Sequence, residues 1–345
     1  MVVAACGGGN GGSSPSQNTP SSGSNVTNTT TGQEGSVDQP NILLIISDDQ
    51  GLDSSAQYSL SDNPPVTPTI DQLALGGIVF DNVWATPACT TTRSTVITGQ
   101  YGVHSGILDI GDELPTDAMT LQRFLASDEK TSNYQSAVIG KWHLGGTATN
   151  TNHPAAVGID YYAGNLRGSI ADYRDWDLTI NGVTNRSTEY HTSAITDLAI
   201  DWIDSQARPW FLWLAYVAPH TPFHMPPEGL HTQSLSGTDA DISANPRDYY
   251  LAAIEAMDTE IGRLLSGMSE AERDNTLVIY MGDNGTPSRA ADRSVYADGT
   301  KGSFTEGGLR VPMVVSGKGV NRQSAREDAL INSSDLFATI VELAG

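Results

Sequence analysis

Polar, ionisable residues follow four apolar stretches of this sequence, at the points where buried strands would end. The first stretch, "NILLIIS" (41–47), runs into Asp48 and Asp49. The other three run into "GKWHLGG" (140–146), "PHTP" (219–222) and "GDNG" (282–285). Ligands of open α/β sheets bind beyond the carboxyl ends of the strands, so we expect these residues to share one site.

Oxygen ligands for a hard metal ion are the first chemistry these strand ends offer, from Asp48, Asp49, Asp283 and Asn284. A set made only of oxygens favours Ca²⁺, with Mg²⁺ as the alternative, over zinc. Either acidic pair alone is typical of a turn, but finding both pairs after buried strands favours the metal. Adjacent residues of a regular strand point to opposite faces, so Asp48 and Asp49 can face one ion only where the strand breaks up. Gly51 and Gly285 would permit such irregular backbone.

Cationic and proton-transfer groups are the second chemistry, from Lys141, His143, His220 and Lys301. The chain has only four lysines, so two of them in Gly-bounded motifs are informative. An anionic tetrahedral substrate would need cations around it and a histidine to move protons. Four histidines lack a comparable setting and stay unassigned: His153, His191, His224 and His231. Of these, His224 could line the outer part of the pocket.

Cys89 lies in "ACTTTRSTVITG" (88–99), with Arg93 four positions on. Residues 92–98 predict the first turns of a helix, which places the cysteine just ahead of it. A helix N-terminus presents free N–H groups to an anion and lowers the pKa of a thiol. A soft thiolate is nevertheless a poor partner for a hard metal ion, and an oxygen nucleophile would fit better.

In this order the motifs resemble the type I sulfatases of the alkaline-phosphatase superfamily, over residues 41–345. The resemblance rests on the strand ends above and on "TPTIDQLALGGIVFDNVWATPACTTTRSTVITGQY", "APHTPFHMPP" and "KGSFTEGGLRVPM". It implies that Cys89 is oxidised after translation to formylglycine, whose hydrate supplies the oxygen nucleophile. The implied activity is hydrolysis of sulfate esters, either aryl sulfates or sulfated carbohydrates.

The resemblance also implies a role for each matching residue. The Ca²⁺ ligands would be Asp48, Asp49, Asp283, Asn284 and the converted Cys89. Lys141 and Lys301 would neutralise charge on the sulfate, and Lys301 or His220 would assist departure of the alcohol. His143 would take the proton from the second hydroxyl of the hydrate so that sulfate leaves, and Arg93 would orient the hydrated residue.

Two features depart from the family pattern. Formylglycine-generating enzymes recognise Cys-x-Pro-x-Arg, or Cys-x-Ala-x-Arg in some bacteria, whereas the middle position here is Thr91. The retained metal ligands, lysines and histidines nevertheless favour activity. We also expect the chain to lack the small C-terminal subdomain usual in sulfatases, because it stops at "SDLFATIVELAG" (334–345).

Other functions stay open at this point. A phosphonate or phosphodiester hydrolase of the same superfamily could use the same formylglycine. If Thr91 prevents maturation, the chain could be a surface lipoprotein that binds sulfated glycans without cleaving them. A phosphatase with a threonine nucleophile at 90–92 would normally bind two zinc ions through extra histidines, and the oxygen-rich ligand set argues against it.

The alternation of apolar runs with helical patterns predicts an α/β fold. We expect a mostly parallel central sheet flanked by helices on both faces, as in the alkaline-phosphatase superfamily. The expected strands are 41–47, 134–140, 209–218 and 275–282, and the expected helices are 191–205 and 247–268.

Residues 1–40 are almost all small or polar, which predicts a flexible tether ahead of a catalytic domain at 41–345. The sequence "VAAC" (3–6) resembles a bacterial lipobox. It implies a lipid anchor at Cys6 and a place in the bacterial cell envelope, periplasmic or surface-exposed. The apolar stretch before Cys6 is too short for a complete signal peptide, so we expect a clipped signal sequence. A formal net charge of -22 argues against nucleic acid as a partner.

Overall fold

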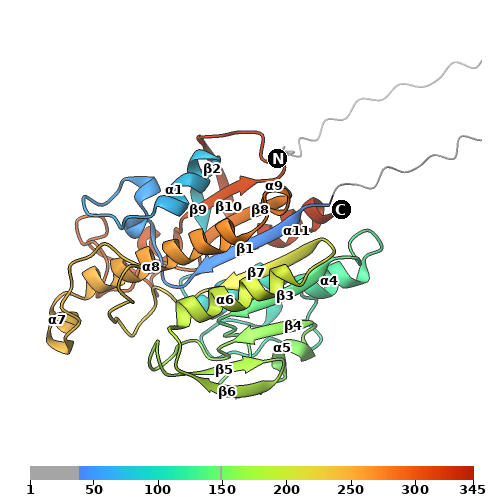
Figure 1. Cartoon of the computed structure of the whole chain (residues 1–345), viewed down its shortest axis with the longest axis horizontal. Coiled ribbons are helices and arrows are strands. Elements are labelled where there is room, and N and C mark those ends of the chain that lie inside the picture. Colours follow the sequence, from blue (N-terminus) through green and yellow to red (C-terminus); the bar gives the residue numbers. More distant parts are fainter. Residues whose placement is uncertain (1–38, 148–149) are drawn as a thin grey trace, which may run out of the picture. The chain divides into compact units, whose positions relative to one another are not determined.

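A ten-stranded sheet forms the centre of the described part of the chain (Figure 1). The computed structural model describes residues 39–147 and 150–345, so Cys6 and nearly all of the predicted head lie outside the described residues. Gln39–Gly345 is one compact unit. The strand order is β10-β2-β9-β8-β1-β7-β3-β4-β5-β6. The bounds of these strands are β1 (Asn41–Ser47), β2 (Gly77–Trp84), β3 (Gln135–Gly140), β4 (Tyr161–Gly164), β5 (Trp176–Ile180), β6 (Val183–Ser187), β7 (Trp210–Ala215), β8 (Thr276–Gly282), β9 (Met313–Gly317) and β10 (Ala325–Asn332).

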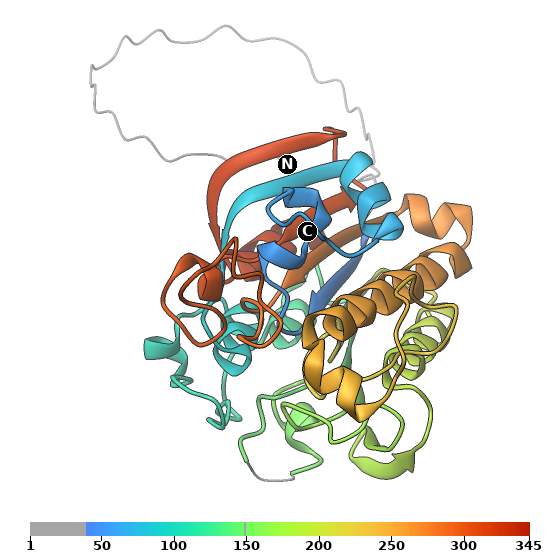
Figure 2. The ribbon, with the colours of Figure 1, turned by 90° about the vertical axis from the view of Figure 1, so that its left-hand side faces the viewer.

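The middle of the sheet is parallel, and both flanks contain antiparallel pairs. The five consecutive strands β8-β1-β7-β3-β4 are parallel to one another. β9 runs antiparallel between β2 and β8, while β5 and β6 form an antiparallel hairpin beside β4. Figure 2 shows β10 (red) beside β2 (light blue) at the other edge. The predicted mostly parallel sheet is therefore confirmed for the centre, where four apolar runs form β1, β3, β7 and β8.

Helices cover both faces of the sheet, as predicted. The helices are α1 (Pro68–Leu75), α2 (Cys89–Thr98), α3 (Gly102–Ser105), α4 (Leu121–Ser127), α5 (His153–Ala156), α6 (His191–Asp204), α7 (Asp239–Ala244), α8 (Pro246–Gly267), α9 (Glu270–Asp274), α10 (Glu306–Leu309) and α11 (Asp335–Ala344), with 3-10 turns η1 (Leu52–Ser54) and η2 (Ala56–Tyr58). Thr120, Thr238 and Ser269 each cap the helix that follows, because the side-chain oxygen accepts an otherwise unpaired N–H of the first turn.

The alternation of side chains along β1 explains the two helical layers. Ile42, Leu44 and Ile46 join the cluster that contains apolar residues of α2, α4 and α11. Leu43 and Ile45 join the cluster that contains residues of α1, α6 and α8. Successive strand residues point to opposite faces, so a strand covered on both sides is apolar throughout. This is why "NILLIIS" contains no alternation of polar and apolar residues.

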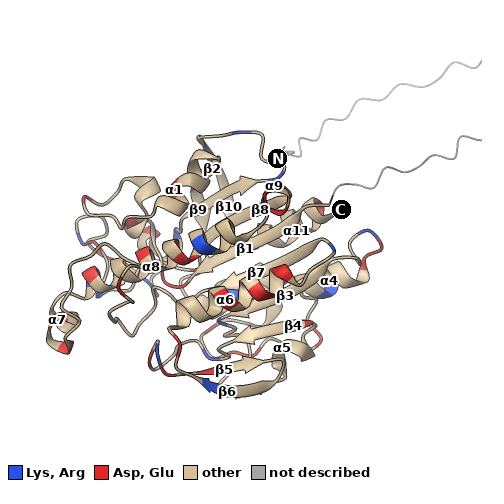
Figure 3. Ribbon diagram, viewed as in Figure 1, with Lys and Arg blue, Asp and Glu red and all other residues tan. Residues whose placement is uncertain are grey.

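The outer surface is strongly acidic. Acidic residues mark α6, α7 and α8 in Figure 3, and basic residues are more scattered. Within 39–147 and 150–345, none of the helices combines the length and hydropathy needed to cross a bilayer.

Gly140 ends β3 just before the predicted site and is required for two reasons. Its φ of 112° is unfavourable for other residues, and an added Cβ would lie 1.9 Å from the Ala215 carbonyl oxygen on β7. We expect Gly140→Ala to lower the free energy of unfolding by about 3 kcal/mol or more, measured by urea denaturation. Gly106→Ala is the matched control, because Gly106 has a φ of 79° but no atom within 4 Å of the added Cβ. It should cost only about 1 kcal/mol, and equal losses would contradict the role of close strand contact.

Candidate active site

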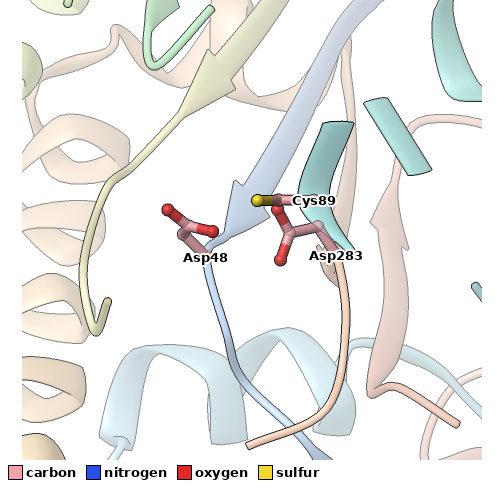
Figure 4. A group of neighbouring side chains, drawn as sticks. All are labelled: Asp48, Cys89 and Asp283. Carbon is pink, nitrogen blue, oxygen red and sulfur yellow. The ribbon is translucent and has the colours of Figure 1, made fainter. Parts of the chain in front are cut away.

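The ends of β1, β3, β7 and β8 meet at one edge of the sheet, as the sequence predicts. Asp48 follows β1 and Asp283 follows β8, and the first residue of α2 lies beside them. Figure 4 shows the carboxylates of Asp48 and Asp283 and the thiol of Cys89 gathered in one group. One ligand atom from each of these three buried residues lies within 4.8 Å of the other two.

Each site lysine lies against a carboxylate of the β1 end. Lys141 Nζ is 2.5 Å from Asp48 Oδ2, and both side chains are fully buried. Lys301 Nζ is 2.5 Å from Asp49 Oδ1. Burial would lower the pKa of Lys301, but the Asp49 and Asp48 charges outweigh it and raise that pKa. Lys301 is therefore held as a cation beside Asp49, and the Lys141 ammonium lies against Asp48.

Arg93 connects three parts of the site from beneath. Its guanidinium donates to Asp283 Oδ2 at 3.0 Å and to the Lys141 carbonyl oxygen at 2.9 Å. Asp48 Oδ1 is 4.0 Å away. Burial would lower the pKa of the guanidinium, but Asp283 and Asp48 outweigh that effect and raise it. The residue predicted to orient Cys89 thus makes its direct contacts with a carboxylate and the backbone.

Two buried oxygens of the site lack hydrogen-bond donors, which is the feature that a bound cation would satisfy. Asp48 Oδ1 and Asn284 Oδ1 are both buried without a hydrogen-bond partner. The Asn284 amide donates its N–H groups to Asp49 Oδ1 at 2.8 Å and to the Gly285 carbonyl oxygen, so its own oxygen stays available. Burial and the neighbouring Asp48 charge raise the pKa of Asp283. Unpaired buried oxygens and crowded carboxylates fit Ca²⁺ or Mg²⁺.

We expect Ca²⁺ to stabilise the EDTA-treated protein, raising Tm by about 5–10 °C. An ion at 100 times its Kd adds about 2.7 kcal/mol to the free energy of unfolding. In a domain of this size, 1 kcal/mol shifts Tm by about 2–4 °C. Asn284→Ala should remove most of this shift, and the exposed Asp201→Asn should keep it. Differential scanning fluorimetry measures these Tm shifts. An equal Ca²⁺-induced shift in both variants would place the ion elsewhere.

The backbone irregularity that brings Asp48 and Asp49 together lies in Asp49 itself. Asp49 has a φ of 70° and His143 has a φ of 56°, both in the left-handed region. The prediction that Gly51 and Gly285 supply this freedom is wrong for Gly51, which has an extended φ of -90°. Both glycines instead permit close approach of the backbone. A Cβ added to Gly51 would lie 2.8 Å from Thr286 N, and one added to Gly285 would lie 1.8 Å from the Gly307 carbonyl oxygen.

Cys89 is the first residue of α2, whereas the sequence placed it just ahead of the helix. Its Sγ lies 3.2 Å from His143 Nδ1. Burial raises the pKa of the thiol, and the Lys141 charge lowers it by less. The prediction that the helix N-terminus lowers this pKa is therefore wrong, because desolvation dominates in so closed a position. An unmodified Cys89 is a neutral thiol, which is a weak nucleophile and a weak ligand.

His143 is held next to Cys89 in its neutral form. Burial and the Lys141 and Arg93 charges lower the pKa of His143 to about 2. Its Nε2 lies 3.1 Å from Thr90 Oγ1, a contact that sequence reasoning missed although Thr90 adjoins the cysteine. The imidazole beside position 89 is therefore unprotonated and presents a ring-nitrogen lone pair to a group there.

His220 faces the carboxylates from the loop after β7. Its Nε2 lies 3.7 Å from Asp49 Oδ2, and its Nδ1 lies 2.7 Å from the Thr221 carbonyl oxygen. The Tyr173 hydroxyl donates to the His220 carbonyl oxygen at 2.7 Å. Tyr173 also stacks on His224, with ring centroids 3.7 Å apart. No sequence pattern pointed to Tyr173, because it lies in an irregular segment far along the chain from β7.

The other unassigned histidines have structural partners or lie apart from the cluster. His153 accepts a hydrogen bond from Trp142 Nε1 at 3.0 Å, and His191 Nε2 lies 3.0 Å from Asn165 Oδ1. His231 lines a separate hollow with Met225 and Leu235. The site therefore contains all the residues singled out at the strand ends, and none of these three.

The central sheet with helices on both faces has the alkaline-phosphatase-like fold, and the carboxylate cluster and Cys89 lie at the carboxyl ends of its parallel strands. The sequence profile of the family described as Sulfatase matches residues 40–345, and the chain belongs to this family. The chain is 28% identical to mouse arylsulfatase J, covering 89% of this chain and 52% of that protein. It is also 28% identical to human N-acetylgalactosamine-6-sulfatase, covering 91% of this chain and 64% of that protein. The chain thus spans about half to two-thirds of the length of these relatives.

Solved structures share the fold over most of this chain. The structure of Ps i-CgsB in complex with k-i-k-neocarrahexaose superposes with a TM-score of 0.75 at 29% identity, covering 89% of this chain and 72% of that chain. A phosphonate monoester hydrolase of Agrobacterium radiobacter superposes with a TM-score of 0.63 at 18% identity, covering 88% and 73%. The second similarity is one of fold alone.

Proposed function

We propose that the chain hydrolyses sulfate esters through a formylglycine derived from Cys89 and a bound divalent cation, Ca²⁺ or alternatively Mg²⁺. The observation that carries the proposal is the grouping of Cys89 with Asp48 and Asp283, beside a neutral His143, in a member of the sulfatase family. This grouping puts a modifiable residue where an anionic ester and its counter-charges would meet.

The neutral thiol of Cys89 is the reason to invoke the modification. Burial holds the thiol in its protonated form, and thiolate sulfur suits soft metals better than a carboxylate-bound Ca²⁺. A formylglycine hydrate at the same position would supply one hydroxyl that attacks sulfur and passes its proton to a neighbouring carboxylate. Deprotonation of the second hydroxyl would then re-form the C=O bond and break the C–O bond to sulfate, which leaves. The oxygens of both hydroxyls are hard and match the surrounding ligands.

The position of each remaining residue suggests its catalytic role. Lys141 and Lys301 supply positive charge to the sulfate oxygens. Lys301 or His220 donates a proton to the alcohol oxygen as its bond to sulfur breaks. His143, kept neutral by burial, accepts the proton from the second hydroxyl at position 89.

The cation would be held by Asp48, Asp49, Asp283 and Asn284 together with the residue at position 89. When bound, it would polarise the sulfate oxygens and offset the negative charge of the carboxylates. The unpaired Asp48 Oδ1 and Asn284 Oδ1 support this assignment.

A sulfated carbohydrate is the favoured substrate over a simple aryl sulfate. The support comes from two similar proteins: one is named an N-acetylgalactosamine-6-sulfatase, and the other was solved with a neocarrahexaose. The arylsulfatase name of a third relative keeps aryl sulfates as a second substrate class.

Maturation and location form part of the proposal. A formylglycine-generating enzyme would convert Cys89 despite Thr91, whose hydroxyl donates to the Ala88 carbonyl oxygen at 2.8 Å in the first turn of α2. A lipid on Cys6 would hold the protein in the bacterial cell envelope, and this rests only on the sequence around Cys6. With a complete signal sequence placed ahead of Val3, labelling of the chain but not of its Cys6→Ser variant by a palmitate analogue in a bacterial host would support the anchor.

The proposal is tested by the mass of the peptide that carries Cys89, after coexpression with a formylglycine-generating enzyme. An aldehyde mass together with hydrolysis of 4-nitrophenyl sulfate supports it. Thr91→Pro restores the usual recognition pattern at a first-turn position that tolerates proline. An intact thiol in both proteins, with retained binding of sulfated glycans, would favour a binding lipoprotein. Faster hydrolysis of phenyl phosphonates or phosphodiesters than of sulfates would favour the other hydrolase class.

A further inference from the structure

A hollow lies between the segment after β4 and the β5–β6 hairpin. This hairpin forms one edge of the sheet (Figure 1). The volume of the hollow is about 560 Å³. One wall is the segment 165–171 that follows β4, and the other is the face of the β5–β6 hairpin that contains Asp177, Thr179, Thr184 and Arg186. A hollow of this volume has room for a sugar residue.

The segment 165–171 is shared between this hollow and the proposed active site. Trp142 N donates to the Asn165 carbonyl oxygen at 3.0 Å, and His143 N donates to the Leu166 carbonyl oxygen at 3.1 Å. A Cβ added to Gly168 would lie 2.2 Å from two atoms of the His143 ring, so the backbone of residue 168 lies against the imidazole. The neighbours of Gly168 in the chain, Arg167 and Ser169, line the hollow. A substrate bound at His143 would therefore be separated from the hollow by the segment 165–171 alone.

Arg167 is the cation of the hollow that has no carboxylate partner. Arg186 binds both acidic residues of the lining, with Nε 2.5 Å from Asp175 Oδ1 and Nη1 2.9 Å from Asp177 Oδ1. Arg167 is exposed, and no carboxylate of the described residues forms an ion pair with its guanidinium. Of the two arginines that line the hollow, Arg167 is thus the one whose guanidinium is available to an anionic ligand.

We propose that this hollow binds the sugar adjacent to the one that carries the scissile ester, and that Arg167 pairs with an anionic group on it, a carboxylate or a second sulfate. The inference rests on the proposed function and adds the class of substrate: a carbohydrate with a second negative charge. The guanidinium fork matches the geometry of carboxylate and sulfate oxygens. Ser169 belongs to the same lining and adds a hydroxyl-bearing side chain beside Arg167.

The test compares Arg167→Gln with Arg208→Gln in the converted enzyme. Arg208 is also exposed and unpaired among the described residues, but it precedes β7 at the opposite end of the strands. The substrates are the disaccharide of chondroitin 6-sulfate, which carries a sulfate ester and a uronate, and its uronate methyl ester. 4-Nitrophenyl sulfate reports the basal activity.

Arg167→Gln should lower kcat/KM for the acidic disaccharide by about 10–100-fold, as expected for loss of a charged hydrogen bond. It should leave kcat/KM for the methyl ester and for 4-nitrophenyl sulfate unchanged. Arg208→Gln should leave kcat/KM for all three substrates unchanged. An equal loss on all substrates, or no loss on the acidic disaccharide, would overturn the proposal.

Failure of the proposed function would look different, because wild type would then cleave none of these compounds. Calorimetric titration of the acidic disaccharide into the unconverted protein tests the anion site independently of sulfatase activity. Weaker binding in Arg167→Gln than in Arg208→Gln would support the anion site without sulfatase activity. Equal affinities, or no binding to wild type, would overturn the anion site as well.

Discussion

Cys89→Ala is expected to lower kcat for sulfate esters by about 10⁴-fold or more, with only a small change in Tm. The variant removes the only side chain at the centre of the cluster that conversion could turn into an oxygen nucleophile, and loss of a nucleophile costs rates of this size. The side chain is buried, but sulfur is a small group, and its removal should cost about 1 kcal/mol. The measurement is initial-rate kinetics on 4-nitrophenyl sulfate beside a thermal melt.

Cys89→Ser separates the proposed mechanism from its nearest alternative. Serine keeps an oxygen at the helix start, but it lacks the thiol that the cysteine-oxidising maturation enzyme needs, so this variant should be as inactive as the alanine variant. Substantial activity in Cys89→Ser would contradict the formylglycine mechanism and would favour a hydroxyl nucleophile, as in a phosphatase. Retained activity in Cys89→Ala would move the nucleophile away from position 89.

The strand ends could be predicted because the information for them is local. A continuous apolar run followed by polar residues and glycine marks both a buried strand and its end, and β1, β3, β7 and β8 lie within a few residues of the predicted ranges. Parallel strands carry their carboxyl ends to one edge, so the grouping of Asp48 with Asp283 followed from fold class alone.

The properties that could not be predicted depend on packing between distant segments. The pKa of Cys89 follows from how completely other elements cover the start of α2, and the sequence shows only the helix. Tyr173 supports His220, and Gly168 lies against His143, through contacts from a segment without regular periodicity. The hollow beside β5 and β6 requires the antiparallel edge of the sheet, for which these short polar strands gave no clear pattern.

Arg93→Met is expected to lower the free energy of unfolding by about 3–5 kcal/mol, the cost of leaving buried charges without their partner. Arg93 is fully buried and donates to Asp283, which already lies close to Asp48. The corresponding fall in Tm is about 6–20 °C in EDTA. Arg208→Gln, which removes an exposed arginine, should change stability by less than about 0.5 kcal/mol.

Two comparisons identify why Arg93 matters. Adding Asp283→Asn to Arg93→Met should recover part of the lost stability, because one unpaired carboxylate is removed. Saturating Ca²⁺ should also reduce the loss, because a bound cation would take over neutralisation of Asp48 and Asp283. If the loss is the same with Ca²⁺ and with EDTA, and the second substitution recovers nothing, Arg93 acts chiefly through its hydrogen bond to the Lys141 carbonyl oxygen. Its role would then be to fix the end of β3, and the carboxylates would depend on Lys141 and Lys301 for their counter-charge.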